Sequence, residues 1–200
     1  MNNEMIYYHI YSGATGGPDI AREYRKEAES TWFCTGCGHP KPAFQAIDIR
    51  VQENPIEGPA LNSEWGVPIA RKDFLAMLGE NNIQKYLYIG KVFGPNNEIV
   101  NDWVTFRGKE KLIVRGSKNA QHRSCDQCGR NVYFAMGKSY LYPSPPKGIA
   151  LFESDLCGLI MPETLFPAID PARLKGLLVE KLPVLSSPRD GFAELAGWYS

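Results

Sequence analysis

The sequence is poor in histidine and has no excess charge of either sign, and each shortage excludes a class of protein. Its three histidines occur in His9-Ile-Tyr, His39-Pro-Lys and His122-Arg-Ser, so the H-x-E element that a zinc deaminase needs is missing. No nucleophile can be paired with a base, and we therefore expect a protein that is not an enzyme. The 22 basic and 22 acidic side chains balance, which argues against nucleic acid as a partner.

Long apolar runs are also missing. No stretch approaches the roughly 20 apolar residues that a membrane helix requires. The chain starts with Met1-Asn2-Asn3-Glu4, without the basic region and apolar core of a signal peptide. We therefore expect a cytoplasmic protein that does not contact a membrane.

Prolines and glycines are spread along the chain and predict an α+β fold of many short elements. The sequence has 15 prolines and 19 glycines, which favour turns over long helices. Alternating or β-branched residues predict strands, among them 5–11, 44–51, 86–93, 100–106 and 177–182. Ala70, Phe74, Met77 and Leu78 share one helix face, with Gly79 placed to end that helix. A second short helix is expected to begin at Pro162, since proline suits the first helical position.

Four of the five cysteines form two C-x-x-C-G motifs, Cys34-Thr-Gly-Cys37-Gly38 and Cys125-Asp-Gln-Cys128-Gly129. Such a motif is a tight turn that brings two sulfurs to one side, and paired C-x-x-C motifs are typical of metal binding in a reducing compartment. Four thiolates would form a closed tetrahedral site for a structural zinc ion. Another metal, or cysteines that are reduced or form disulfides, are the alternatives.

A histidine beside the first motif and the fifth cysteine are left out of this ligand set. His39 could replace a thiolate, although an ordinary loop histidine is the simpler interpretation. Cys157 lies in the apolar stretch Leu156-Cys157-Gly158-Leu159-Ile160 and is expected in the core. The predicted metal ligands are therefore Cys34, Cys37, Cys125 and Cys128.

The two cysteine motifs belong to a longer internal similarity. They recur at an offset of 91 residues, glycine and apolar positions between 66 and 77 recur between 158 and 169 at an offset of 92, and 86–92 resembles 176–182 at an offset of 90. This pattern predicts pseudo-repeats at 31–94 and 122–184. We expect two related strand-rich lobes with short helices, joined by a zinc site made of both motifs; a chance match of short apolar patterns is the alternative.

With the two C-x-x-C-G motifs, Trp65-Gly66-Val67-Pro68-Ile69 between them, and the segments 151–154 and 158–160, the chain resembles the double-CxxCG family of bacterial immunity proteins. The resemblance implies that residues 1–200 form a single immunity-type domain. It also implies that the protein binds the toxin domain of a polymorphic toxin and neutralises it in the producing cell. The identity of that toxin does not follow from the resemblance.

Inhibitors of this kind commonly place carboxylates over a basic active-site cleft, which accelerates association. Exposed charges facing water are the alternative interpretation of each carboxylate. The candidate toxin contacts are Asp48, Glu53, Glu57 and Glu64, and a second cluster of Glu153, Asp155 and Glu163. Trp65, Trp103 and Trp198 could be interface anchors, with core packing as the alternative.

A competing hypothesis is a zinc-ribbon module that contacts nucleic acid or the transcription machinery. It would use a basic stripe near the second cysteine motif: Lys109, Lys111, Arg115, Lys118, Arg123 and Arg130. The neutral total charge argues against this function, although a local stripe could suffice.

Overall fold

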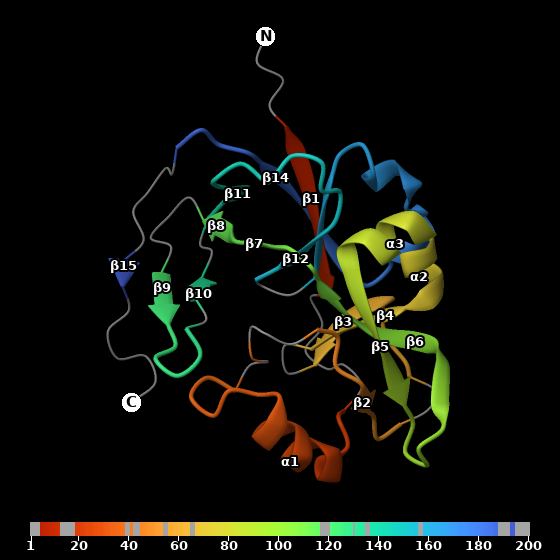
Figure 1. Ribbon diagram of the computed structural model, residues 1–200. Helices are drawn as coiled ribbons and strands as arrows, with labels where there is room; N and C mark the ends of the chain where they lie inside the picture. The colour runs from red at the N-terminus through yellow and green to blue at the C-terminus, as the bar shows by residue number, and fades with distance from the viewer. Residues whose placement is uncertain are drawn as a thin grey trace.

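The computed structural model describes residues 5–12, 19–38, 41, 45–53, 56–64, 67–116, 121–129, 131–134, 137–155, 158–187 and 193–194. These residues form short strands arranged in several sheets, together with short helices, as expected for an α+β protein (Figure 1). The helices are α1 (Arg22–Thr31), α2 (Lys72–Ala76) and α3 (Glu80–Tyr86), with 3-10 turns η1 (Phe166–Ala168) and η2 (Pro171–Leu174). None of the described helices combines the length and the apolar composition that crossing a membrane requires.

The first sheet has five strands in the order β2 (Ile49–Arg50), β5 (Leu87–Phe93), β6 (Ile99–Gly108), β4 (Val67–Arg71) and β3 (Leu61–Glu64). β6 is the central strand and runs antiparallel to both β4 and β5, whereas β2 runs parallel to β5. The chain enters β6 from β5 through a tight turn in which Gly94 N–H donates to the Glu98 carbonyl at 2.8 Å.

The second sheet also has five strands, in the order β14 (Leu177–Pro183), β1 (Ile6–Ser12), β13 (Leu159–Pro162), β12 (Phe152–Ser154) and β7 (Lys111–Leu112). β1 runs antiparallel to both β13 and β14. Smaller sheets complete the fold: β8 (Val114–Gly116) pairs with β11 (Ser139–Leu141), and β9 (Gln121–Ser124) lies between β10 (Asn131–Phe134) and β15 (Ala193–Glu194). β11 meets the outer edge of β14 through a parallel bridge between Leu141 and Val184.

The two large sheets correspond in the order of four strands. β3-β4-β6-β5-β2 in the first sheet corresponds to β12-β13-β1-β14 in the second, with β11 meeting β14 in parallel as β2 meets β5. Each sheet takes one interior strand from the other half of the chain: β1, from the start of the chain, completes the sheet of β12 to β14, and β6 completes the sheet of β2 to β5. A duplication would produce such an arrangement, and the duplication itself stays a prediction.

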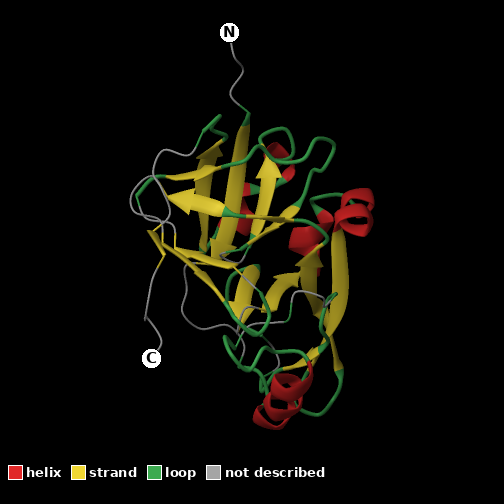
Figure 2. Ribbon diagram, turned by 60° about the vertical axis from the view of Figure 1, so that its left-hand side comes forward, coloured by secondary structure: helices red, strands yellow, loops and turns green. Residues whose placement is uncertain are grey.

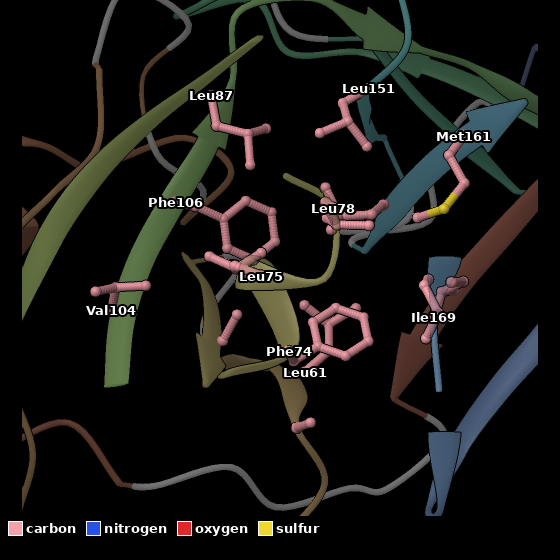
Figure 3. Close-up of a cluster of buried hydrophobic side chains, with 14 of the residues drawn as sticks. Leu61, Phe74, Leu75, Leu78, Leu87, Val104, Phe106, Leu151, Met161 and Ile169 are labelled. Carbon is pink, nitrogen blue, oxygen red and sulfur yellow. The ribbon is translucent and has the colours of Figure 1, made fainter. Parts of the chain in front are cut away.

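The main hydrophobic core lies between the two sheets. Val104 and Phe106 of the first sheet and Met161 of the second converge on Phe74, which is fully buried in α2 (Figure 3). The short helices lie at the periphery of the strands (Figure 2). Arg173 of η2 forms an ion pair with Asp73 of α2 at 2.8 Å. A second hydrophobic cluster, around Phe33 and Trp103, packs on the other face of the first sheet. A third cluster, around Val114 and Leu141, packs on the other face of the second sheet.

Several element predictions need correction. The expected helix over 70–78 is shorter: α2 covers Lys72–Ala76 with Met77 as its C-cap, and Ala70 belongs to β4. Gly79 does not end this helix, because it is the N-cap of α3, with φ 83°. The expected helix at Pro162 is wrong, because this residue ends β13; β12 pairs only with Leu159 and Ile160, so the proline lies beyond that pairing. The strand over 44–51 reduces to β2, and α1 was not predicted.

Candidate metal centre

Each C-x-x-C-G motif forms a tight loop that we call a knuckle: the first is Cys34–Gly38 and the second is Cys125–Gly129. The N–H of Gly38 donates to the Cys34 carbonyl, and the N–H of Gly129 donates to the Cys125 carbonyl, both at 2.8 Å. These closing glycines have φ values of 68° and 67°, a region that residues with a Cβ rarely adopt. The glycine of the motif is therefore required by the turn that aligns the sulfurs.

The structure brings the two knuckles together. Cys34 Sγ lies 3.6 Å from Cys125 Sγ, and Cys37 Sγ lies 3.7 Å from Cys128 Sγ. All four sulfurs lie within 4.8 Å of one another. A metal–sulfur bond of about 2.3 Å in tetrahedral geometry separates sulfurs by about 3.8 Å, whereas a disulfide bond is about 2 Å long. The four cysteines are free thiols whose spacing fits ligation of one metal ion.

The environment favours the thiolate form of Cys34. Cys34 and Cys125 are 4% and 8% exposed, while Cys37 and Cys128 are half-buried. Burial raises the pKa of the Cys34 thiol, but hydrogen bonds from the amides of Cys37 and Gly36 and from the thiols of Cys125 and Cys128 outweigh it. Together they lower this pKa from 9.0 to about 7. The Gly36 N–H lies 3.3 Å from Cys34 Sγ, and such amide donors orient a ligating sulfur.

Contacts outside the sulfurs hold the knuckles in register. The hydroxyl of Thr35 donates to Gln127 Oε1 at 2.6 Å, so the tips of the two loops are bonded to each other. Gly36 faces the Gln127 side chain so closely that an added Cβ would lie 2.9 Å from its Cδ. The first knuckle is anchored by Phe33, which is buried in the cluster behind the first sheet. Sequence reasoning missed Thr35 and Gln127, because a polar pair between distant loops leaves no local pattern.

The predicted toxin-contact carboxylates lie in different environments. Glu53 and Glu57 are exposed, and Asp48 is exposed although its Oδ1 accepts the N–H of Lys91 at 2.7 Å. Asp155 is half-buried, with Oδ1 accepting the Val114 N–H at 2.9 Å. The side chain of Glu64 lies outside the described residues.

Glu153 has to be removed from the predicted interface. Its residue is 3% exposed, and its carboxylate is held by Arg107 at 3.0 Å and by Lys111 at 2.7 Å. Glu153 Oε2 also accepts the N–H of Gly108 at 2.9 Å. A partner protein cannot reach this group, which instead ties β12 to β6 and β7.

Half of the basic stripe is engaged within the protein. Lys109 Nζ donates to the Gln84 carbonyl at 2.7 Å, Lys111 binds the buried Glu153, and Arg115 Nε donates to the Tyr142 carbonyl at 2.9 Å. The remaining side chains of the stripe, and several other residues singled out in the sequence, lie outside those described: Lys118, Arg123, Arg130, His39, Cys157, Trp65 and Trp198. Trp103 is buried behind the first sheet, so it is a core residue.

Comparison with known proteins adds no relative. No family model matches the chain, and no curated protein matches it in sequence. The resemblance to immunity proteins therefore rests on the two knuckles and the segments around them.

Proposed function

We propose that this protein is an immunity protein that binds and neutralises a cognate bacterial toxin domain, and that a structural zinc ion holds its two knuckles together. The observation that carries the proposal is the convergence of Cys34, Cys37, Cys125 and Cys128 from distant parts of the chain. It provides the double-knuckle centre on which the family resemblance depends.

Zinc is the metal that this ligand set favours. Four thiolates are soft ligands, and their tetrahedral arrangement is typical of zinc sites that stabilise a fold. Such a site leaves no position for water or substrate, so we propose a structural role and a protein that is not an enzyme. Free thiols kept for metal binding fit a reducing compartment, which supports a cytoplasmic location.

The surface supplies groups that an inhibitor could use. Asp48, Glu53 and Glu57 are exposed in one stretch of chain that includes β2, so their charges can act over a basic partner surface. Each isolated surface charge contributes little affinity, and the main effect expected is on the association rate. The interface with the toxin includes this acidic stretch, and the buried Glu153 is not part of it.

The nucleic-acid hypothesis is less well supported. Lys109, Lys111 and Arg115 are already bonded to carbonyls or to Glu153. Redirecting them to phosphates would break these contacts, and breaking the ion pair of Lys111 would leave Glu153 with fewer partners. With balanced total charge, a steeply salt-dependent affinity for DNA or RNA is not expected.

Co-expression tests the proposal. If an adjacent reading frame encodes a large secreted protein with a variable C-terminal domain, producing this chain together with that domain should rescue growth and yield a complex. A Glu53→Gln, Glu57→Gln variant should associate more slowly, while a variant with the exposed Glu110→Gln, outside the candidate contacts, should behave as wild type. Continued killing by the domain, with the protein folded and its metal bound, would reject the immunity function and leave the zinc centre standing.

A further inference from the structure

A pocket of about 210 Å³ opens between β11 and the outer edge of β14, a gap that we call the seam. Its lining residues are Lys138, Ser139, Tyr140, Glu180, Lys181, Pro183 and Leu185. The two strands meet at one end, where Leu185 N–H donates to the Leu141 carbonyl at 3.1 Å, and Lys138 and Lys181 of the lining precede this contact in the chain. The pocket is therefore bordered by the edges of two strands.

The corresponding seam in the first sheet is closed by a carboxylate. There, Asp48 Oδ1 accepts the N–H of Lys91 at 2.7 Å, next to the parallel pairing of β2 with β5. Lys91 is the fifth residue of β5, and Lys181 is the fifth residue of β14. In one sheet, the strand-edge N–H at this position is bound by a carboxylate of the same chain.

Among the described residues, no carboxylate occupies the corresponding position of the second sheet. When Lys181 is matched with Lys91, Pro183 matches Phe93, which pairs with Arg50 of β2. The bridge between Leu141 and Val184 places Tyr140 opposite Pro183, so Tyr140 matches Arg50. By the same count, the position of Asp48 is taken by Lys138. A cation therefore stands where the first sheet has its anion.

The N–H of Lys181 points into the seam. Val184 N–H donates to the Met5 carbonyl beside β1, whereas Leu185 N–H donates outward to Leu141. Because successive N–H groups of a strand alternate in direction, the N–H of Lys181 points outward like that of Leu185. Among the described residues, no strand pairs with this edge of β14 before the bridge at Val184.

We propose that the seam binds a carboxylate, which accepts the backbone N–H of Lys181 and pairs with the ammonium groups of Lys138 and Lys181. Charge-assisted hydrogen bonds to a carboxylate are stronger than those between neutral groups. Glu180 is the one acidic residue of the lining, and its charge acts on Tyr11 of β1: burial first, and then Glu180, raise the pKa of that tyrosine. Two cations and one anion leave the pocket with net positive charge.

An acidic side chain of an extended peptide is the occupant that best fits the site. The volume is small for a drug-sized ligand but adequate for a carboxylate and a few carbon atoms. The free edge of β14 can pair with a further strand, and Leu178 and Val179 on it are 48% and 39% exposed. This site is separate from the acidic stretch of the proposed toxin interface and does not depend on that function.

Amide NMR of the intact chain can test the proposal with three probes: acetyl-Val-Glu-Val-amide, its Gln counterpart, and free glutarate. The Glu peptide should shift the amide signal of Lys181 more than any signal of the first sheet, and the Gln peptide should not. Lys181→Gln should weaken binding about threefold to tenfold. Lys138→Asp should abolish it, because the variant supplies its own carboxylate as Asp48 does in the first sheet.

Lys91→Gln is the matched control, since it changes the equivalent lysine in the sheet whose seam is already closed. The affinity of the Lys91→Gln variant for the Glu peptide should stay at the wild-type value. If glutarate binds as tightly as the Glu peptide, the result would support the carboxylate site and identify a small dicarboxylate as its ligand. Equal binding of the Gln peptide, no shift at Lys181, or an equal loss in Lys91→Gln would overturn the proposal.

Discussion

Glu153 shows how one residue can have the sequence context of a surface charge and the environment of a core. Its neighbours in the chain include Asp155, so sequence reasoning placed it in an exposed acidic cluster. Folding brings it beside Arg107, 3.0 Å away and from a strand of the other sheet, and beside Lys111 at 2.7 Å. This contact depends on the pairing of β12 with β7, and no local sequence pattern predicts that pairing.

Glu153→Gln should destabilise the protein by about 3 kcal/mol. The amide keeps the shape of the side chain but removes its charge, so the guanidinium of Arg107 stays buried with a weaker partner. Urea unfolding at matched metal content measures the change. The control is Glu163→Gln, an exposed carboxylate whose replacement should cost less than about 0.5 kcal/mol. Equal midpoints for the two variants would mean that the buried ion pair contributes nothing to stability.

Gly158 is required for a different reason, because it combines positive φ with a close approach. Its φ is 96°, and an added Cβ would collide with the carbonyl oxygen of Ile10 in β1. Gly158→Ala should therefore cost about 2–4 kcal/mol of unfolding free energy, since neither backbone can move without breaking the β1–β13 ladder. Thermal or urea unfolding gives the value.

The matched control for this prediction is Gly148→Ala. Gly148 has φ 78°, but an added Cβ would meet no atom within 4 Å. It should lose only the conformational term of about 1–2 kcal/mol. If Gly158→Ala and Gly148→Ala lose the same unfolding free energy, the close approach of Gly158 to Ile10 adds nothing to the cost of the substitution.

At the scale of elements, the strands of the two large sheets were the most predictable. β5 and β14 follow from their apolar and β-branched residues, and each was expected within a residue or two of its observed bounds. α1 was missed because its sequence, REYRKEAEST, has no apolar stripe to reveal the helical period. The helix expected at Pro162 was wrong because tertiary pairing with Tyr7 keeps that residue in a strand.

α2 has few residues but contributes the centre of the main core. Phe74 is fully buried among side chains of both sheets (Figure 3). Phe74→Ala should cost about 3–5 kcal/mol, whereas the exposed Lys72→Ala in the same helix should cost less than about 0.5 kcal/mol. The metal content of folded Phe74→Ala should equal that of the wild type, because the first knuckle is anchored behind the first sheet. Loss of metal from the folded variant would show that core and knuckles are coupled.

At the scale of the whole molecule, the cysteine cluster was predictable and the topology was not. The C-x-x-C-G motif is a local signal, since the cysteine pair and its glycine form one turn. Two such turns were expected to converge, and the four sulfurs do lie together. The exchange of β1 and β6 between the sheets could not be predicted, because strand pairing between distant segments depends on faces and edges that exist only after folding.

Removing the proposed metal ion should loosen the whole molecule, because such an ion would join the knuckles at 34–38 and 125–129, which are far apart in the chain. Cys125→Ser should lose the metal and about 4 kcal/mol of stability or more. A chelator should lower the unfolding midpoint of the wild type by a similar amount and have no further effect on the variant. Asp126→Asn, an exposed change within the second knuckle, is the control and should retain the metal. Elemental analysis that finds zinc absent from the purified wild type would contradict the proposed centre.

The interior strands that each sheet takes from the other half of the chain lead to a last prediction about the whole chain. A cut in the turn between β5 and β6 gives fragments 1–95 and 96–200, each containing one knuckle and most of one sheet but an interior strand of the other. Neither fragment alone should unfold cooperatively, because an interior strand is missing from its sheet. Co-expressed, they should assemble one to one and bind one metal ion per pair.

A first fragment that starts at residue 19 is the control, because it lacks β1 but keeps the knuckle and all strands of the first sheet except β6. It can complete the first sheet with β6 of the other fragment, but the second sheet then has no strand between β13 and β14. Cooperative unfolding of the pair should therefore be lost, as circular dichroism and size-exclusion chromatography can measure. Assembly of equal stability without β1 would show that the exchange of strands is not what holds the two sheets together, and that the metal and the shared core suffice.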